Sequence, residues 1–358
     1  MSLLAHMPVL YRPRMTLPMP TPRRCLHLIA LSLMFGAAAQ AAAAPACPSS
    51  DLKVFAQAFA SSPELQQAFT AVPLVEQRPI TDERGREVTA RYKLTGDTHH
   101  LLTRLAPKAQ AEAGLQTFWE GNTLVVNDPL GDVVQAFVFE QGACWQLVRV
   151  EQWSMDELLT HNAPAGESAL QRQMRKADLF LGYGGREQYP LTAYFFELGQ
   201  RILLDAARHG SPKAAVQAVS LGYSGMAPAL KPGEPEELLL PYAKTDAEAA
   251  LMLSMYYCDP VGDGSITQCQ QPRKSEELVL RTARELDSGS AFYYLGSGYA
   301  DGQWGVTDRP RALACHQEAL KRGDLHSLWP LTWWSKKNEM PAGGAQCLEP
   351  SAPAQAGS

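Results

Sequence analysis

The stretch "YYLGSGYADGQWGVTDRPRALACHQEALKRGD", residues 293–324, decides the fold of the C-terminal half of the chain. Two runs of apolar and small residues at helical spacing flank the glycine-containing segment "ADGQWGV". Glycine turns a chain at positive φ without steric cost, and an aspartate such as Asp308 is a good helix N-cap. The stretch therefore predicts two helices joined by a tight turn.

The pattern of this stretch, which begins at Ala291 with a small residue four positions before a leucine, recurs along the chain. Related patterns begin 36 residues later at Ser327, 42 residues earlier at Ala249, and a further 34 residues earlier at Ala215. Recurrence at such intervals is typical of stacked supersecondary repeats. In the segment "DAEAALMLSMYY" nearly every helical face is apolar, as a helix wedged between neighbours requires. We therefore predict helix-pair repeats over residues 161–338.

The glycines of the quoted stretch have two predicted roles, and neither is chemical. Gly302 and Gly305 lie between the helices, where positive φ is needed. Gly296 lies within the first helix, where glycine costs about 1 kcal/mol relative to alanine. A close crossing with a neighbouring helix would offset that cost, so we predict such a crossing at Gly296.

The full pattern A-x-x-x-L-G-x-x-Y-x-x-G-x-x-G-V-x-x-D-x-x-x-A resembles the Sel-one-like repeat, a relative of the tetratricopeptide repeat. The matching positions are Ala291, Leu295, Gly296, Tyr299, Gly302, Gly305, Val306, Asp308, Ala312, Ala319 and Gly323. Earlier units match more loosely; the unit from Ala249 has Ser254 at the helical glycine position. The resemblance implies a curved α-solenoid that binds other proteins, with structural rather than catalytic roles for these residues.

Residues 47–160 follow a different pattern. The helical segment "SDLKVFAQAFASSPELQQAFTAV" precedes short β-rich runs divided by Gly, Asp and Asn, which predicts an antiparallel sheet. This segment and "ACWQLVRVEQW" resemble an uncharacterised family of exported bacterial proteins with the nuclear-transport-factor-two-like cone fold. The resemblance implies a cup that holds a ligand or active site in some relatives. The predicted fold class is α+β followed by all-α.

The first 46 residues predict a secretory signal peptide. Four arginines precede an apolar run that is shorter than the ~20 residues of a membrane span, and the small-residue exit "AQA" follows. A retained membrane anchor is the alternative, and Met15 is a candidate for the true start. We predict a periplasmic or secreted protein that is not inserted in the membrane after cleavage, with a disordered tail over residues 339–358.

The net negative charge of the chain disfavours nucleic acid as a partner. Residues 1–41 contain four of the 32 basic residues and none of the 37 acidic ones, so their removal leaves a net charge of −9. Binding to a phosphate backbone depends on clustered Lys and Arg, and no basic run is present in the sequence. We expect a protein partner instead.

Six cysteines remain after Cys25, which lies in the predicted signal peptide. An even number in an exported chain predicts disulfides, because the periplasm and the cell exterior are oxidising. The domain layout favours the pairs Cys47–Cys144, Cys258–Cys269 and Cys315–Cys347, the last of which would pin the tail over the end of the array. Free buried thiols, a zinc site and a lipid on Cys47 are the alternatives.

Candidate residues for chemistry are few. No nucleophile-elbow, zinc-protease, Walker or dinucleotide motif is present in the sequence. His99 and His100 are expected to be exposed in a hairpin turn rather than to act as ligands. The loop between Cys258 and Cys269 has acidic and hydroxyl residues, but their spacing misses that of a calcium loop: Asp259, Asp263 and Ser265. In the predicted cup the candidates are better explained as core: Tyr92, Trp119, Asp128 and Trp145.

The sequence therefore predicts an exported, non-enzymatic protein without cofactor or metal, which binds a partner protein through its solenoid surface. Exported Sel-one-like arrays include immunity proteins that neutralise phospholipase toxins, so the resemblance implies such a toxin, or an envelope protein, as the partner. The alternative is a periplasmic enzyme or small-ligand binder that uses the cup of the N-terminal domain. Some disulfide-rich proteins of the resembled family act on β-lactams, which keeps the enzyme alternative open.

Overall fold

The computed structural model describes residues 45–186, 190–262, 268–340 and 344–349. Residues 1–44 of the predicted signal peptide, the end of the predicted disordered tail, Asp263 and Ser265 lie outside the described residues. The described residues belong to one compact unit, residues 45–358. Among them, no helix has both the length and the apolar character that a membrane span requires.

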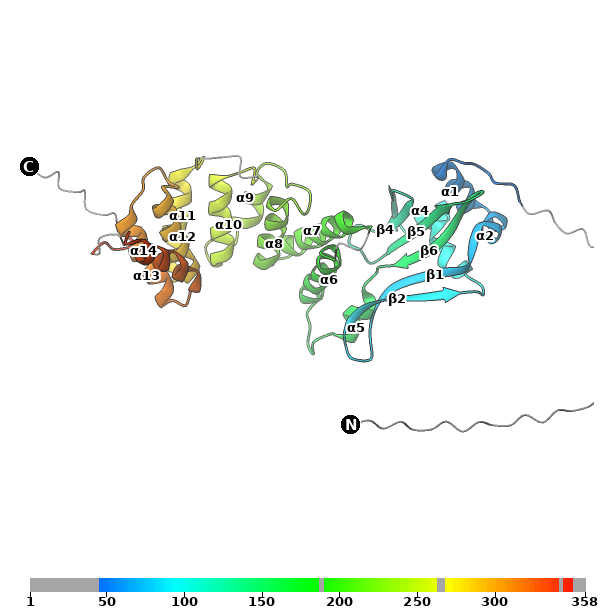
Figure 1. Cartoon of the computed structure of the whole chain (residues 1–358), viewed down its shortest axis with the longest axis horizontal. Helices are drawn as coiled ribbons and strands as arrows, with labels where there is room; N and C mark the ends of the chain where they lie inside the picture. Colours follow the sequence, from blue (N-terminus) through cyan, green and yellow to red (C-terminus); the bar gives the residue numbers. More distant parts are fainter. Residues whose placement is uncertain (1–44, 187–189, 263–267, 341–343, 350–358) are drawn as a thin grey trace, which may run out of the picture. The chain divides into compact units, whose positions relative to one another are not determined.

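The N-terminal part of this unit is α+β: two helices lead into a six-stranded sheet (Figure 1). The helix α1 (Leu52–Ser61) begins where the Asp51 side chain accepts a hydrogen bond from Val54 N, and Ser62 caps α2 (Pro63–Phe69) in the same way. The strands are β1 (Thr70–Thr81), β2 (Glu87–Leu94), β3 (Gln116–Glu120), β4 (Thr123–Asn127), β5 (Val134–Gln141) and β6 (Trp145–Gln152). Between β2 and β3 lie α3 (His99–Leu102), η1 (Thr103–Leu105) and α4 (Pro107–Glu112).

The sheet is mixed, so the prediction of an antiparallel sheet is wrong at one strand pair. The strand order is β2-β1-β6-β5-β4-β3, and β1 pairs with β6 in parallel, with Gln77 opposite Glu151. The other neighbours are antiparallel. A parallel pair needs a long crossover connection, which here is formed by everything from β2 to β5. Local alternation along each strand cannot show which distant strand will lie beside it.

Both faces of the sheet are covered. Successive residues of a strand point to opposite faces, and Val126 belongs to a core cluster with Phe55 and Phe59 of α1, whereas Val125 belongs to the cluster on the other face. That second cluster includes Phe195 and continues through the helices as far as α11. The sheet and the first helices of the C-terminal part therefore share one core.

The C-terminal part is all-helical, which confirms the predicted fold class of α+β followed by all-α. Neighbouring helices pack against one another, most extensively α6 with α7 and α12 with α13. The predicted domain boundary after residue 160 falls inside α5. The elements are α5 (Asp156–His161), α6 (Ala169–Gly184), α7 (Thr192–Arg208), α8 (Pro212–Tyr223), α9 (Glu234–Leu239), α10 (Ala247–Cys258), α11 (Pro272–Glu285), α12 (Gly289–Asp301), α13 (Arg309–Lys321), η2 (Leu325–Ser327) and α14 (Leu328–Lys337).

Side-chain caps and prolines explain where many of these helices begin. Ser168 and Gln171 form a reciprocal capping box at the start of α6. Proline occupies the first turn of several helices, where its missing N–H has no helical acceptor to lose. Side chains that accept a hydrogen bond from the first helical turn are Ser211, Asp246, Ser288 and Asp308.

Three disulfides join the six cysteines in the pairing that the domain layout favours: Cys47–Cys144, Cys258–Cys269 and Cys315–Cys347. The first ties the segment before α1 to the start of β6. The second closes the insertion after α10, and the third holds residues near Cys347 against α13, where Arg311 Nε donates to the Cys347 carbonyl at 2.8 Å. Stable disulfides are typical of oxidising compartments.

Candidate functional site

The predicted repeat residues lie together in the α12–α13 hairpin. Ala291, Leu295 and Tyr299 are buried along α12, and Ala312 and Ala319 are buried on the facing α13. All five belong to one hydrophobic cluster. Their contacts are therefore with the core of the helical region.

The turn of this hairpin has the geometry that its glycines allow. Gly302 ends α12 at φ 71°, and Gly305 follows at φ 102°. The Asp308 side chain accepts a hydrogen bond from Arg311 N and begins α13, which Gly323 follows at φ 82°. These conformations are strained for residues with a Cβ, so the residues at these positions shape the backbone.

Gly296 is in the close crossing that its place within a helix predicts. A Cβ at this position would lie 2.7 Å from ring atoms of His316, a side chain of α13. The same helix makes a second close contact at Gly298, where a Cβ would lie 2.4 Å from Trp304. The missing side chains let α13 and the turn approach α12 closely.

The first prediction concerns this crossing. Gly296→Ala is expected to destabilise the protein by about 1–3 kcal/mol, because the added methyl overpacks a buried ring. Gly182→Ala is the matched control in α6: its Cβ would meet nothing within 4 Å, so the better helix propensity of alanine is expected to stabilise by up to about 1 kcal/mol. Denaturant unfolding of both variants measures the difference. Equal effects would contradict the close crossing.

His316 is a buried histidine whose importance the sequence did not reveal. It is 1% exposed, its Nδ1 lies 3.2 Å from Ser327 Oγ, and its ring packs against Tyr293 and Trp334. Burial lowers the pKa of His316 to about 4, although the charge of Asp324 opposes the shift. The neutral imidazole is thus a part of the terminal core.

The second prediction follows from this lowered pKa. Between about pH 6.5 and pH 4 the unfolded chain binds a proton at His316 that the folded protein does not, so stability is full above pH 6.5 and falls as the pH is lowered. From pH 7 to pH 5 the expected loss due to His316 is about 2 kcal/mol. Comparing the unfolding free energy of His316→Gln with wild type at both pH values isolates it. An unchanged pH dependence in the variant would refute the assignment.

The predicted cup of the N-terminal part is filled by side chains. The rings of Phe55 and Phe59 pack edge-on against Phe139 of β5 at 6.1 and 5.8 Å between centroids. All three are fully buried. The layer between α1 and the sheet is therefore aromatic core.

The four cup candidates are not brought together. Trp119 packs against Phe139 in this core, as expected, whereas Tyr92 is 37% exposed under the Arg78 guanidinium. Asp128 accepts hydrogen bonds from the amides of its own loop, and Trp145 Nε1 donates to the Ser50 carbonyl at 2.8 Å. Each of these residues has a local structural role.

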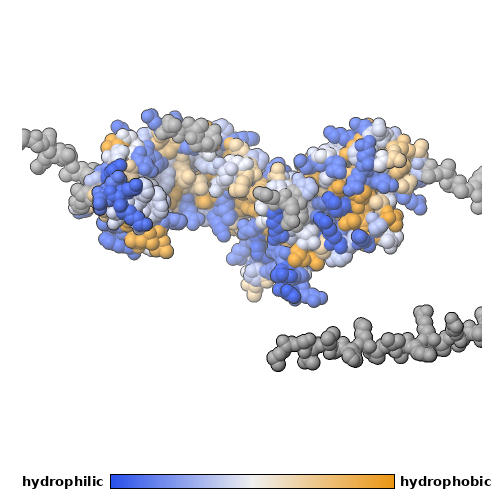
Figure 2. Space-filling model, viewed as in Figure 1, coloured by the Kyte–Doolittle hydropathy of each residue, from blue (hydrophilic) through white to orange (hydrophobic). Residues whose placement is uncertain are grey.

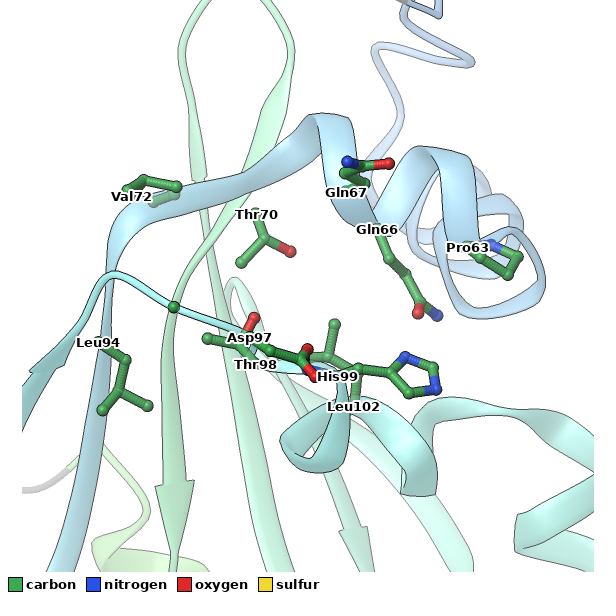
Figure 3. A pocket seen from close by; sticks show the side chains of 12 residues that line it. Pro63, Gln66, Gln67, Thr70, Val72, Leu94, Asp97, Thr98, His99 and Leu102 are labelled. Carbon is green, nitrogen blue, oxygen red and sulfur yellow. Dashed lines mark hydrogen bonds between the residues drawn. The ribbon is translucent and has the colours of Figure 1, made fainter.

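A polar pocket of about 370 Å³ opens at the rim of this layer, between α2, the start of β1 and the turn before α3 (Figure 3). Gln66 Nε2 donates to the Phe59 carbonyl, and Asp97 Oδ1 accepts from His99 N. Thr70 Oγ1 is buried without a hydrogen-bond partner among the described residues. The hydrogen bonds of Gln66 and Asp97 hold the rim in place. These two side chains therefore have structural roles in the pocket.

The histidine prediction is half right. His99 and His100 are exposed, as expected. They begin α3 rather than a hairpin turn, because Leu101 and Leu102 bury themselves in the core and draw the chain into a helical turn. Within the described ranges, no group of three or more His, Cys, Asp or Glu side chains is placed to hold a metal.

An exposed aromatic patch is the feature that distinguishes the last helix. It consists of Trp329 and Trp333, which are four residues apart on one face of α14, together with Leu328 at the start of α14 and Leu325 in the preceding η2. Trp329 is 72% exposed and Trp333 46%, and their rings stack at 6.0 Å with an interplanar angle of 14°. Lys337 Nζ lies 5.0 Å from the centre of the Trp333 ring. On the face drawn in Figure 2, apolar groups are interspersed among hydrophilic residues.

Sequence reasoning missed this patch. The spacing Trp-x-x-x-Trp from Trp329 to Trp333 was available as a signal that two large side chains share a face. The sequence alone does not show that the described helices leave this face exposed while the adjacent Trp334 is buried against His316.

Comparisons of the chain with protein-family models, with curated proteins and with solved structures give no match.

Proposed function

We propose that the chain is an exported, non-enzymatic binding protein whose helical region engages a partner protein through the aromatic patch. The observation that carries this proposal is the pair of stacked, exposed tryptophans Trp329 and Trp333 on α14. Contiguous exposed apolar surface marks interaction sites on soluble proteins. Tryptophan is also enriched among the residues that dominate binding energy at interfaces.

The energetics favour a partner that covers both rings. A tryptophan side chain buries about 150–250 Å² when covered, and stacking holds the two rings in one orientation before binding. Leu325 in η2 and Leu328 at the start of α14, which are 66% and 47% exposed, add to the apolar surface. A preorganised apolar face loses little side-chain entropy when a partner covers it.

The charge beside the patch indicates the kind of partner surface. Lys336 and Lys337 end α14 and are exposed. An apolar surface with acidic residues at its rim would complement the patch and these two lysines, since opposite charges at an interface rim steer association. We therefore propose an apolar partner surface with an acidic rim.

The resemblance to Sel-one-like repeats supplies the finer part of the proposal. The helices of residues 161–338, α6 to α14, would be the repeats, and the protein would act in the periplasm or outside the cell after removal of a signal peptide. The three disulfides fit an oxidising compartment. A secreted phospholipase-type toxin, which the chain would neutralise as an immunity protein, or an envelope protein is the proposed partner.

The alternative function, a ligand site or active site within the cup of the N-terminal part, has less support. Phe55, Phe59 and Phe139 fill the space between α1 and the sheet. An active site there would need polar groups facing open space. The packing of this layer therefore favours the aromatic patch over the cup.

Capture of the partner tests the proposal. The full chain, tagged at its C-terminus so that the predicted signal peptide can still export it, is expressed in its own host, crosslinked in the periplasm and purified, with an exported tag alone as control. We expect a stoichiometric protein that is absent from the control, such as a lipase-like toxin or an envelope protein. If the chain is expressed at its native level with its neighbouring genes present and repeatedly purifies with no such protein bound, partner binding is contradicted.

A further inference from the structure

A second polar pocket, of about 390 Å³, lies between the sheet edge and α7. Phe118 of β3 and Asn127 of β4 line it on one side. Tyr194, Glu197 and Arg201 line it from α7, where their spacing places them on one helical face. The pocket is distinct from the filled cup, which lies on the opposite face of the sheet.

Two of the residues that line this pocket, Asn127 and Arg201, have buried polar atoms without partners among the described residues. Asn127 is 3% exposed; its Nδ2 donates to Tyr194 Oη at 2.5 Å, but its Oδ1 accepts no hydrogen bond from the described chain. Arg201 Nη1 donates to Glu197 Oε1 at 3.3 Å, and the guanidinium lies over the Tyr194 ring, 5.8 Å from its centre. The buried Nε and Nη2 make no hydrogen bond within the described ranges. Most buried polar atoms in proteins are partnered. An acceptor and two donors together therefore indicate a place for a ligand.

The unpartnered atoms define complementary chemistry. Nε and Nη2 form one edge of the guanidinium, the fork that binds a carboxylate with two parallel hydrogen bonds. The Arg201 side chain is 32% exposed, so rotation of its terminal torsions can turn this edge toward a ligand. Asn127 Oδ1 requires a donor. Glu120 and Glu197 also line the pocket, and two carboxylates against one guanidinium favour a ligand with a positive group as well.

We propose that this pocket binds a small zwitterion, with its carboxylate on the Arg201 fork and its ammonium group near Asn127 Oδ1 and the glutamates. An amino acid or a short peptide with free termini has this chemistry. The volume lies near the lower end of the range for small-molecule sites, about 300–1,000 Å³. The rings of Phe118 and Tyr194, 4.8 Å apart, offer an apolar wall. Burial raises the pKa of Tyr194 to about 12, so its hydroxyl stays neutral.

Isothermal titration calorimetry of the chain without residues 1–44 tests the proposal with alanine, lysine and the dipeptide Ala-Ala as probes. We expect at least one to bind with a dissociation constant below about 1 mM. Propionate lacks the ammonium group and alaninamide lacks the carboxylate. Each should bind at least about tenfold more weakly than alanine. Tighter binding of a single amino acid would identify a free amino acid as the ligand; tighter binding of Ala-Ala would identify peptide termini.

Matched variants of α7 separate the site from general effects. Arg201→Gln and Arg201→Lys should each weaken binding about tenfold or more, because Lys keeps the charge but loses the fork. Arg208→Gln, on the same helix but paired with Glu234, should leave affinity unchanged. Melting temperatures establish that each variant is folded. No binding of any probe, or binding that both Arg201 variants retain, would overturn the proposal, and partner binding by α14 would be unaffected.

Discussion

Replacing Cys47 and Cys144 by alanine is expected to lower the free energy of unfolding by about 4–5 kcal/mol. The disulfide spans 97 residues and encloses nearly the whole α+β part, so its loss frees a large loop in the unfolded chain. Cys47 is exposed, and the substitution removes little packing. Equilibrium unfolding in denaturant, followed by circular dichroism, measures the change.

Removal of the Cys258–Cys269 disulfide is the matched control. It spans only 11 residues, so the same loop-entropy reasoning expects a loss of about 3 kcal/mol, some 2 kcal/mol less than for the long loop. Alanine at all four positions avoids introducing buried hydroxyl groups at Cys258. Removal of Cys258–Cys269 could lower the unfolding free energy as much as removal of Cys47–Cys144 does. In that case the constraint on the unfolded chain would not be the source of the effect.

The second large effect is expected at the aromatic patch. The double variant Trp329→Ser and Trp333→Ser should weaken partner binding at least about 100-fold, because a central interface tryptophan contributes about 2 kcal/mol or more. The loss in unfolding free energy, about 1–2 kcal/mol, should be smaller than the loss in binding free energy, because Trp329 is mostly exposed and Trp333 only half-buried. Affinity measured by surface plasmon resonance on the captured partner, beside a denaturant titration, separates the two quantities.

The control for this variant uses exposed apolar residues of the α+β part. Val54 and Val72 are 54% and 77% exposed, and Val54→Ser with Val72→Ser removes exposed apolar surface far along the chain from α14. Binding should be unaffected. A loss of affinity in this control equal to that of the tryptophan variant would mean that general hydrophobicity, not the patch, drives association.

The helical region was the part most accessible from sequence, because its determinants are local. The turn glycines, the Asp308 cap and the helical spacing of apolar residues all act within a few positions of one another. The preferred cysteine pairing also followed from the order of the elements, since each pair joins the ends of one part. The crossing at Gly296 was predictable from its cost within a helix, although its partner His316 was not.

The features that sequence did not reveal depend on distant neighbours. The parallel pairing of β1 with β6 is set by a crossover of more than sixty residues. Trp333 and Trp334 are adjacent and chemically identical, yet one is exposed and the other buried, because only one faces α13. Asn127 and Arg201 line one pocket only because Asn127 of β4 contacts Tyr194 of α7.

Lysine-directed crosslinking in the periplasm, followed by mass spectrometry of the crosslinked peptides, tests the central claim most directly. If the helical region binds a partner through the aromatic patch, crosslinks to that protein are expected at Lys336 and Lys337, which end α14. Lys53, Lys93 and Lys108 are exposed on the α+β part and serve as internal controls. Crosslinks confined to these three lysines, or none to any other protein, would contradict the claim.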